Sequence, residues 1–358
     1  MNKRKIVLNF IPFIIGILLI KFISFSNERV EWYHKHVYSI LSEWLRFFTG
    51  IVPFSIGDIL YAIFTLLFLW GFIQCIKIFV QKKCTVQLLY LKLLSITKWS
   101  LGIYIAFNVC WGLNYQRAGI GEQLQLSNKK YSNDELFNIT DSLIKKVNFY
   151  RAKLPDSVNQ FYSYKQDFEI AFQSYNKLKL EYPFLEYKNK SIKKSYFGKL
   201  GNYAGFLGYI NPFTGEAQVN VTPPKFVLPF VSCHEIAHQL GYASESEANF
   251  VGYLAAKASE DSFFLYSTYF DLFLYANKAC FQKDSIRAKE NFKRLDTLVK
   301  IDFRKYRQFY AKYKNPFEPY IRKFYDQYLK ANDQLKGVES YDEVIGLLIA
   351  FRKKNKFI

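Results

Sequence analysis

The stretch His234-Glu235-Ile236-Ala237-His238 is followed by Gln239-Leu240-Gly241 and then by Glu245-Ser246-Glu247-Ala248-Asn249. On a helix, two histidines four residues apart lie one turn apart on the same face, so both imidazoles can bind one metal ion. Two of the four histidines of the chain are in this motif. The apolar run before it, from Phe226 to Val231, predicts a buried helix whose histidines need polar partners, and a metal ion supplies them.

Two histidines leave such a site one ligand short, because a catalytic zinc usually has three protein ligands and a water. Gly241 can end the motif helix in a left-handed conformation and let the chain turn. A second helix beginning near Ser244 would bring Glu245 or Glu247 back to the metal, but not both, because residues two apart face nearly opposite sides. We take Glu245 as the third metal ligand, with Glu247 as the second choice.

Two further side chains of the motif have predicted roles. Glu235 is the expected catalytic base, because zinc lowers the pKa of a bound water toward about 7 and a nearby carboxylate can then take its proton. Asn249, one turn after Glu245, is expected to hydrogen-bond a ligand. The expected cofactor is one Zn²⁺ per chain, although other divalent ions suit this ligand set. The alternative is a set of ordinary helix histidines followed by an acidic helix N-terminus.

Three apolar runs indicate membrane-spanning helices, because about 20 residues cross a bilayer. They cover residues 6–25, 59–80 and 99–113. A signal peptide is the rival interpretation of the first run, but no small-residue cleavage site follows it. The stretch from His36 to Phe54 contains Glu43 and Arg46, so we expect a helix lying at the membrane interface. Residues 1–115 are therefore a predicted membrane anchor, and residues 116–358 a predicted domain outside the membrane.

Basic residues predict the orientation of the anchor. Seven precede the first run or follow the second, and three lie between the first and second runs; the seven are Lys3, Arg4, Lys5, Lys82, Lys83, Lys92 and Lys98. This bias places the N-terminus in the cytoplasm and the domain on the outer side of the cytoplasmic membrane. The net charge of +19 then fits contact with anionic lipid or a basic solvated surface, rather than nucleic acid.

The remaining pattern predicts an α+β fold in which helices dominate. Glycines and β-branched residues before the motif indicate one small sheet, and the alternation of Glu216, Ala217, Gln218, Val219, Asn220 and Val221 fits a half-buried strand. Pro223 and Pro224 end that strand. Helices are expected over nearly all of the chain after Ser244, among them one from Asp284 to about Tyr313.

The stretch from Pro212 to Gly252, together with Trp111-Gly112-Leu113-Asn114-Tyr115, resembles an uncharacterised family of bacterial membrane proteins. That family has three N-terminal spans and a zincin-like HExxHQxGxAxExEAN signature. More distantly, Glu245 to Asn249 resembles the ExxAD element of membrane zinc metallopeptidases, in which the first glutamate binds zinc. The six residues between His238 and Glu245 are fewer than is typical of that class. In zincins a strand before the motif helix pairs with the substrate, which implies this role for Glu216 to Val221.

The motif and the resemblance together predict a membrane-anchored zinc metallopeptidase that cuts protein or peptide substrates outside the cytoplasm. Two alternatives are open. One is a catalytically inactive, metal-binding membrane scaffold, and the other is a hydrolase of cell-wall amide bonds. The sequence predicts neither the substrate nor the oligomeric state.

Overall fold

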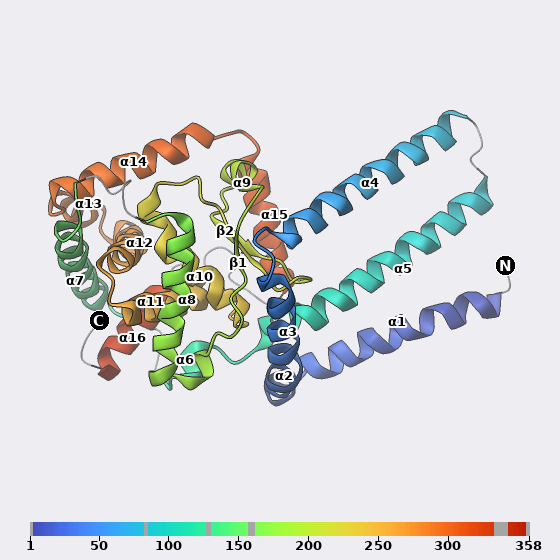
Figure 1. Ribbon diagram of the computed structural model, residues 1–358, viewed down its shortest axis with the longest axis horizontal. Helices are drawn as coiled ribbons and strands as arrows, with labels where there is room; N and C mark the ends of the chain where they lie inside the picture. The colour runs from blue at the N-terminus through green and yellow to red at the C-terminus, as the bar shows by residue number, and fades with distance from the viewer. Residues whose placement is uncertain (1–2, 82–84, 127–129, 157–161, 333–342, 356–358) are drawn as a thin grey trace.

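The computed structural model describes residues 3–81, 85–126, 130–156, 162–332 and 343–355. Three long helices project from one side of a helical domain: α1 (Lys3–Ser24), α4 (Ile56–Val80) and α5 (Val86–Cys110) (Figure 1). Two of them, α4 and α5, are each long and apolar enough to cross a membrane. A third span results if α1 and the helical segment after it, bent by 114° from one to the other, count as one crossing. The chain therefore has two or three candidate membrane helices.

The third predicted span begins too late in the sequence. The helix starts at Val86 rather than at Trp99 and ends at Cys110, so Lys92 and Lys98 lie within it and not in a loop. Long lysine side chains can keep their charge at the membrane surface while the helix continues, which the apolar count does not capture. Lys82 and Lys83 lie outside the described residues.

The stretch expected at the membrane interface forms α2 (Asn27–Tyr33), the short π-helix η1 (His34–Tyr38) and α3 (Ser39–Gly50). In α3 the polar side chains Ser42, Arg46 and Thr49 are buried against the domain. The large apolar side chains are exposed on the other side, namely Ile40, Trp44, Phe47 and Phe48. This distribution, with the polar face inward, is the opposite of that of a water-exposed helix and fits an apolar environment outside the protein.

The anchor and the domain share packing, so the predicted boundary at residue 115 does not separate two independent units. It falls within the 3-10 helix η2 (Gly112–Gln116). Tyr33, Tyr38, Trp111 and Leu113 from the anchor form a buried cluster with Ala243 of the domain. At the start of α4, Glu216 accepts hydrogen bonds from the backbone N–H groups of Ile56 (3.0 Å) and Gly57.

Helices form most of the domain, and their buried faces make one continuous core. The helices that surround the centre of the domain are α7 (Asn133–Ala152), α8 (Tyr164–Glu181), α10 (Leu228–Gln239), α11 (Glu245–Ser259), α12 (Ser262–Lys283) and α16 (Glu343–Asn355). The shorter or peripheral ones are α6 (Ile120–Gln123), η4 (Pro183–Leu185), α9 (Gly198–Ala204), η5 (Lys225–Val227), α13 (Ser285–Lys293), α14 (Thr297–Tyr313) and α15 (Glu318–Ala331). The mostly helical fold with one small sheet is confirmed.

The single helix expected from Asp284 to Tyr313 is wrong, because the structure divides it into α13 and α14. Asp296 adopts an extended conformation as the N-cap of α14, with φ −66° and ψ 157°. The Asp296 side chain makes no capping hydrogen bond; its backbone N–H donates to Oδ1 of Asn148 at 3.0 Å, a contact with α7 that an apolar period does not reveal.

The sheet has three strands, β1 (Ile192–Lys194), β2 (Gly208–Ile210) and β3 (Ala217–Val219), in the order β1-β3-β2. The pairing is parallel between β1 and β3 and antiparallel between β2 and β3. The backbone pairing with substrate that was predicted for Glu216, Ala217, Gln218, Val219, Asn220 and Val221 is excluded along Ala217–Val219, because β3 is the central strand and both of its edges are already paired. An extended substrate can pair only with an edge strand.

Candidate metal centre

The motif helix α10 and the helix α11 form a tight hairpin. Gly241 ends α10 with φ +86°, a left-handed conformation that glycine adopts without strain, as the sequence predicts. Further along, α11 passes close to α10 at Gly252. A Cβ added to Gly252 would lie 3.1 Å from the backbone nitrogen of His234. The absence of a side chain there allows the two helices to approach closely and brings the first turn of α11 back over the histidines.

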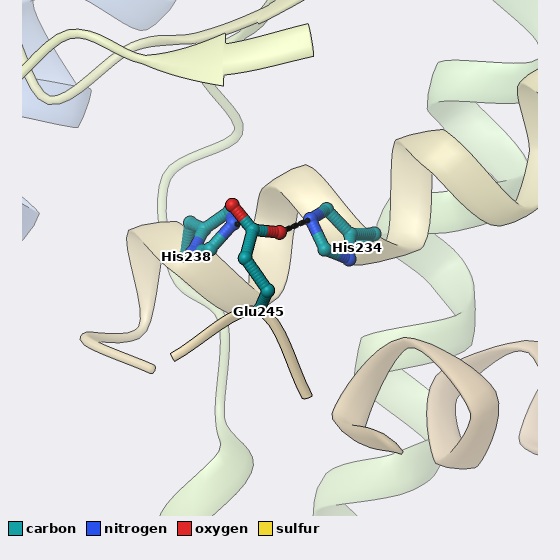
Figure 2. Close-up of side chains that lie close together, drawn as sticks. All are labelled: His234, His238 and Glu245. Atoms are coloured by element: carbon teal, nitrogen blue, oxygen red, sulfur yellow. Dashed lines mark ion pairs between the residues drawn. The ribbon is translucent and has the colours of Figure 1, made fainter. Parts of the chain in front are cut away.

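The side chains of His234, His238 and Glu245 converge at this hairpin (Figure 2). The Glu245 Oε2 atom lies 3.2 Å from Nε2 of His234 and 3.7 Å from Nε2 of His238. One donor atom from each of the three side chains lies within 4.8 Å of the others. Two imidazole nitrogens and one carboxylate oxygen form a ligand set that suits zinc and related divalent ions.

Neighbouring groups orient the three side chains. The Nδ1 atom of His238 lies 2.7 Å from the backbone oxygen of Tyr242. If Nδ1 carries the proton and donates to that oxygen, Nε2 is left with its lone pair facing Glu245. The ring of Trp111 meets the His238 ring edge to face, with centroids 6.1 Å apart. Tyr325 of α15 donates its hydroxyl to Oε1 of Glu245 at 2.8 Å.

The charges of the three side chains are strongly coupled. Burial alone would lower the pKa of His234, but the hydrogen bond and the charge of Glu245 raise it to about 9. Burial opposes ionisation of Glu245 in the same way, and the hydrogen bonds and charges of both histidines hold its pKa well below its usual range. The shifts favour an ion pair between an ionised Glu245 and a protonated His234, and a metal ion would take the place of the proton on that imidazole.

Glu235 lies beside the cluster with its charge poorly compensated. Its side chain is 3% exposed, and its Oε2 atom has no hydrogen-bond partner among the described residues. Burial raises the pKa of this carboxyl group to about 7, although His234 and His238 act in the opposite direction. A carboxylate poised near neutral pH, with a free acceptor, has the properties of a general base.

The structure places the two remaining predicted residues, Glu247 and Asn249, differently with respect to the cluster. Glu247 points away from the histidines toward Gly119, where an added Cβ would lie 3.1 Å from Glu247 Cδ. It is not part of the cluster. Asn249 is 2% exposed, and its amide lies close enough to His234 to raise the pKa of that imidazole. The geometry thus selects Glu245 over Glu247 and places Asn249 behind the first histidine.

The end of α10 is fixed by Gln239 and by the anchor. The Gln239 side chain donates to the backbone oxygens of Ser191 (3.0 Å) and Gly215 (2.6 Å). Its backbone oxygen accepts hydrogen bonds from the hydroxyl groups of Tyr38 and Ser42, at 3.2 Å each, and from the guanidinium group of Arg46, at 3.0 Å. A cation at a helix C-terminus is favourable. Membrane-proximal residues therefore hold the motif helix in place.

The sequence did not reveal two residues of this site. Tyr325 lies 80 positions after Glu245, and no local pattern connects the two. Gly208, in strand β2, faces Glu235 so closely that an added Cβ would lie 2.6 Å from Glu235 Cδ. A glycine within a strand signals close approach of another group, so this one had a recognisable signal.

The fold and the cluster define a class: a membrane protein whose helical domain holds an HExxH helix, with a glutamate returned to it by the next helix. More particularly, the chain belongs to the family described as Protein of unknown function (DUF3810), whose family model matches residues 33–349. The matched region contains α4, α5 and all three residues of the cluster. No curated protein and no solved structure matches the chain.

Proposed function

We propose that this protein is a membrane-anchored, zinc-dependent metallopeptidase with a zincin-like centre. The observation that carries the proposal is the convergence of His234, His238 and Glu245 beside the buried carboxylate of Glu235. An ordinary buried helix would not bring two imidazoles and two carboxylates together, because each buried charge is costly without a partner.

His234, His238 and Glu245 would hold the metal ion, which supplies an acidified water and polarises the scissile carbonyl group. Glu235 accepts a proton from the attacking water and returns it to the nitrogen of the leaving amine, so the carboxyl group ends in its starting state. The hydrogen bond from Tyr325 keeps the Glu245 carboxylate oriented toward the histidines. The hydrogen bond between His238 and Tyr242 does the same for the second imidazole.

Strand β2 is the better candidate for substrate binding. It lies at the edge of the sheet, its outer edge has no strand partner in the described part of the chain, and Gly208 lies against Glu235. An extended peptide added to this edge would have its backbone close to the general base. We extend the proposal to orientation: with the α4–α5 connection in the cytoplasm, the domain would face the outer side of a bacterial cytoplasmic membrane.

The test is metal content of the purified full-length chain, by mass spectrometry, in the wild type and in His238→Ala, Glu245→Ala and Glu247→Ala. We expect one zinc per chain in the wild type and in Glu247→Ala, and at least a tenfold lower occupancy in the other two variants. Glu247→Ala is the matched control, because it removes a carboxylate two residues from Glu245. Equal metal content in all four chains would overturn the proposed ligands.

Activity decides between peptidase and the two alternatives. Zinc-loaded chain in vesicles is incubated with unfolded protein substrates and, in parallel, with cell-wall fragments. Cleavage of proteins that Glu235→Gln abolishes supports the peptidase, and cleavage of wall fragments alone moves the assignment to an amide hydrolase. Zinc bound without turnover of either substrate would point to an inactive scaffold.

A further inference from the structure

Helix α15 exposes an aromatic face. Phe317, Tyr320 and Phe324 are 69%, 73% and 74% exposed, and their spacing places them on one side of the helix. Of the residues of α15, only Leu329 is fully buried. Three large aromatic side chains aligned on an exposed helix face are unusual for a surface that meets only water.

The stripe of Phe317, Tyr320 and Phe324 continues along α15 to Tyr328, one turn after Phe324, and Tyr328 packs against a membrane helix. The Tyr328 ring lies 6.4 Å from the ring of Phe107 in α5, and its hydroxyl lies 3.5 Å from that of Tyr115. Figure 1 shows α15 at the domain ends of α4 and α5, running across their axes. Phe107 is three residues from the end of α5. Its contact therefore sets the depth of α15 relative to the spans.

The length of α5 gives that depth a physical meaning. A helix of 25 residues is about 37 Å long, whereas the hydrocarbon core of a bilayer is about 30 Å thick, so each end of α5 extends into the headgroup region. α15 is attached to such an end. The exposed Lys323 flanks the aromatic face, and an aromatic face with a flanking basic residue is the combination that binds anionic lipid headgroups.

A second helix has the same character at the same end of the spans. α3 exposes Trp44, Phe47 and Phe48 and buries Arg46 against α10. The two helices are more than 260 residues apart in sequence, yet both lie where the spans meet the domain (Figure 1). Two helices at this end of the spans therefore expose large aromatic side chains.

We infer that α15 lies in the headgroup region of the bilayer and contacts anionic lipid through Phe317, Tyr320 and Phe324. Tyr325, which follows Phe324 and points about 100° away from it around the helix, hydrogen-bonds Glu245. Lipid and the candidate metal centre would therefore contact neighbouring sides of one helix. The inference concerns the surface of α15 and is independent of whether the site hydrolyses peptides.

The test is photo-crosslinking of the full-length chain in vesicles of phosphatidylcholine and phosphatidylglycerol. The photoreactive residue p-benzoylphenylalanine replaces Phe324 in one variant and Tyr320 in a second, so that one failed expression does not end the experiment. The matched control replaces Phe281, which is 57% exposed near the end of α12. The next helix, α13, lies at the end of the domain far from the spans (Figure 1).

We expect several-fold more lipid adduct at positions 324 and 320 than at position 281, as measured by mass spectrometry, and a preference for phosphatidylglycerol. Adduct yields equal to those of the control would overturn the inference. Crosslinks from position 324 to a second copy of the chain would overturn it as well, because the face would then be a protein interface.

Discussion

Glu216 and Glu235 are both buried carboxylates beside the same three-stranded sheet, and their surroundings differ. Glu216 accepts hydrogen bonds from two backbone N–H groups at the start of α4 and from the hydroxyl of Thr214 at 3.0 Å. For Glu235, the Oε2 atom has no partner among the residues that the structure describes. Burial raises the pKa of both groups, to about 7 for Glu235.

The difference separates two uses of a buried acid. A carboxylate whose acceptors are occupied holds elements together, and here it ties the sheet to the first turn of a membrane helix. A buried carboxylate oxygen without a hydrogen-bond partner destabilises the fold, so such a group is expected where a ligand or a proton binds to it. The junction at Glu216 and the cluster at Glu235 are therefore expected to respond differently to the same kind of substitution.

The largest effect is expected at Glu235. Glu235→Gln keeps the shape of the side chain and removes the base, so we expect peptide hydrolysis to fall by about 10²- to 10⁴-fold while zinc content is unchanged. Single-turnover kinetics on zinc-loaded chain measure the first quantity, and mass spectrometry the second. Activity equal to that of the wild type would exclude Glu235 as the base.

A smaller loss is expected from Gly208→Ala. The added methyl group would collide with the Glu235 carboxyl group, so the base must move or β2 must shift away from it. A displacement of about 1 Å can cost up to about 100-fold in rate. Gly71→Ala is the control, because nothing lies within 4 Å of the added Cβ at that position. If both glycine variants cleave peptide at the wild-type rate, Gly208 does not constrain the base.

A third prediction concerns Asp167, a buried acid remote from the cluster. Burial raises its pKa from 3.8 to about 7, and neither of its carboxylate oxygens has a hydrogen-bond partner in the described residues. The native chain then holds this proton between pH 4 and 7 when the unfolded chain has lost it, so stability is full below pH 4 and falls as pH rises through 7.

Asp167→Asn removes this dependence. We expect the free energy of unfolding of the wild type to fall by about 3–4 kcal/mol relative to that of the variant between pH 4 and pH 8. Thermal unfolding of both chains in the same detergent measures the difference, and the comparison cancels the other titrating groups. Parallel curves for the two chains would show that the pKa of Asp167 is the same in the folded and the unfolded chain.

The smallest effect is expected at the junction. Glu216→Gln replaces a charged acceptor with a neutral amide against two backbone donors, which we expect to cost about 1 kcal/mol and to lower Tm by about 2 °C. Zinc content and hydrolysis should match those of the wild type. Loss of zinc with an unchanged Tm would show that Glu216 supports the metal centre and does not stabilise the junction.

Much of the fold and part of the cluster followed from local patterns. The turn at Gly241 needs only a left-handed residue, and the two histidines of α10 need only a helical period, so both were predictable. From the sequence, both Glu245 and Glu247 were candidates for the third ligand, whereas in the structure Glu245 lies beside the histidines and Glu247 points toward Gly119. The direction of each side chain depends on how α11 packs on α10 at Gly252 and on the position of Gly119.

The pairing of the strands could not be predicted from local sequence patterns. The alternation from Glu216 to Val221 identifies a strand, but a period of two residues is the same for central and edge strands. The start of α5 was missed for a related reason, because Lys92 and Lys98 reduce the apolar count without ending the helix.

The sequence by itself determined the apolar spans, the predominance of helix and the two histidines on one face, because each depends on residues within a few turns of one another. The tertiary structure alone decided that β3 is the central strand and β2 an edge strand of the described sheet, that Tyr325 reaches Glu245 and that Arg46 of the anchor caps the motif helix. The last two contacts join residues 80 or more positions apart, and the order of the strands depends on which strand packs beside which, so none of the three follows from a local pattern.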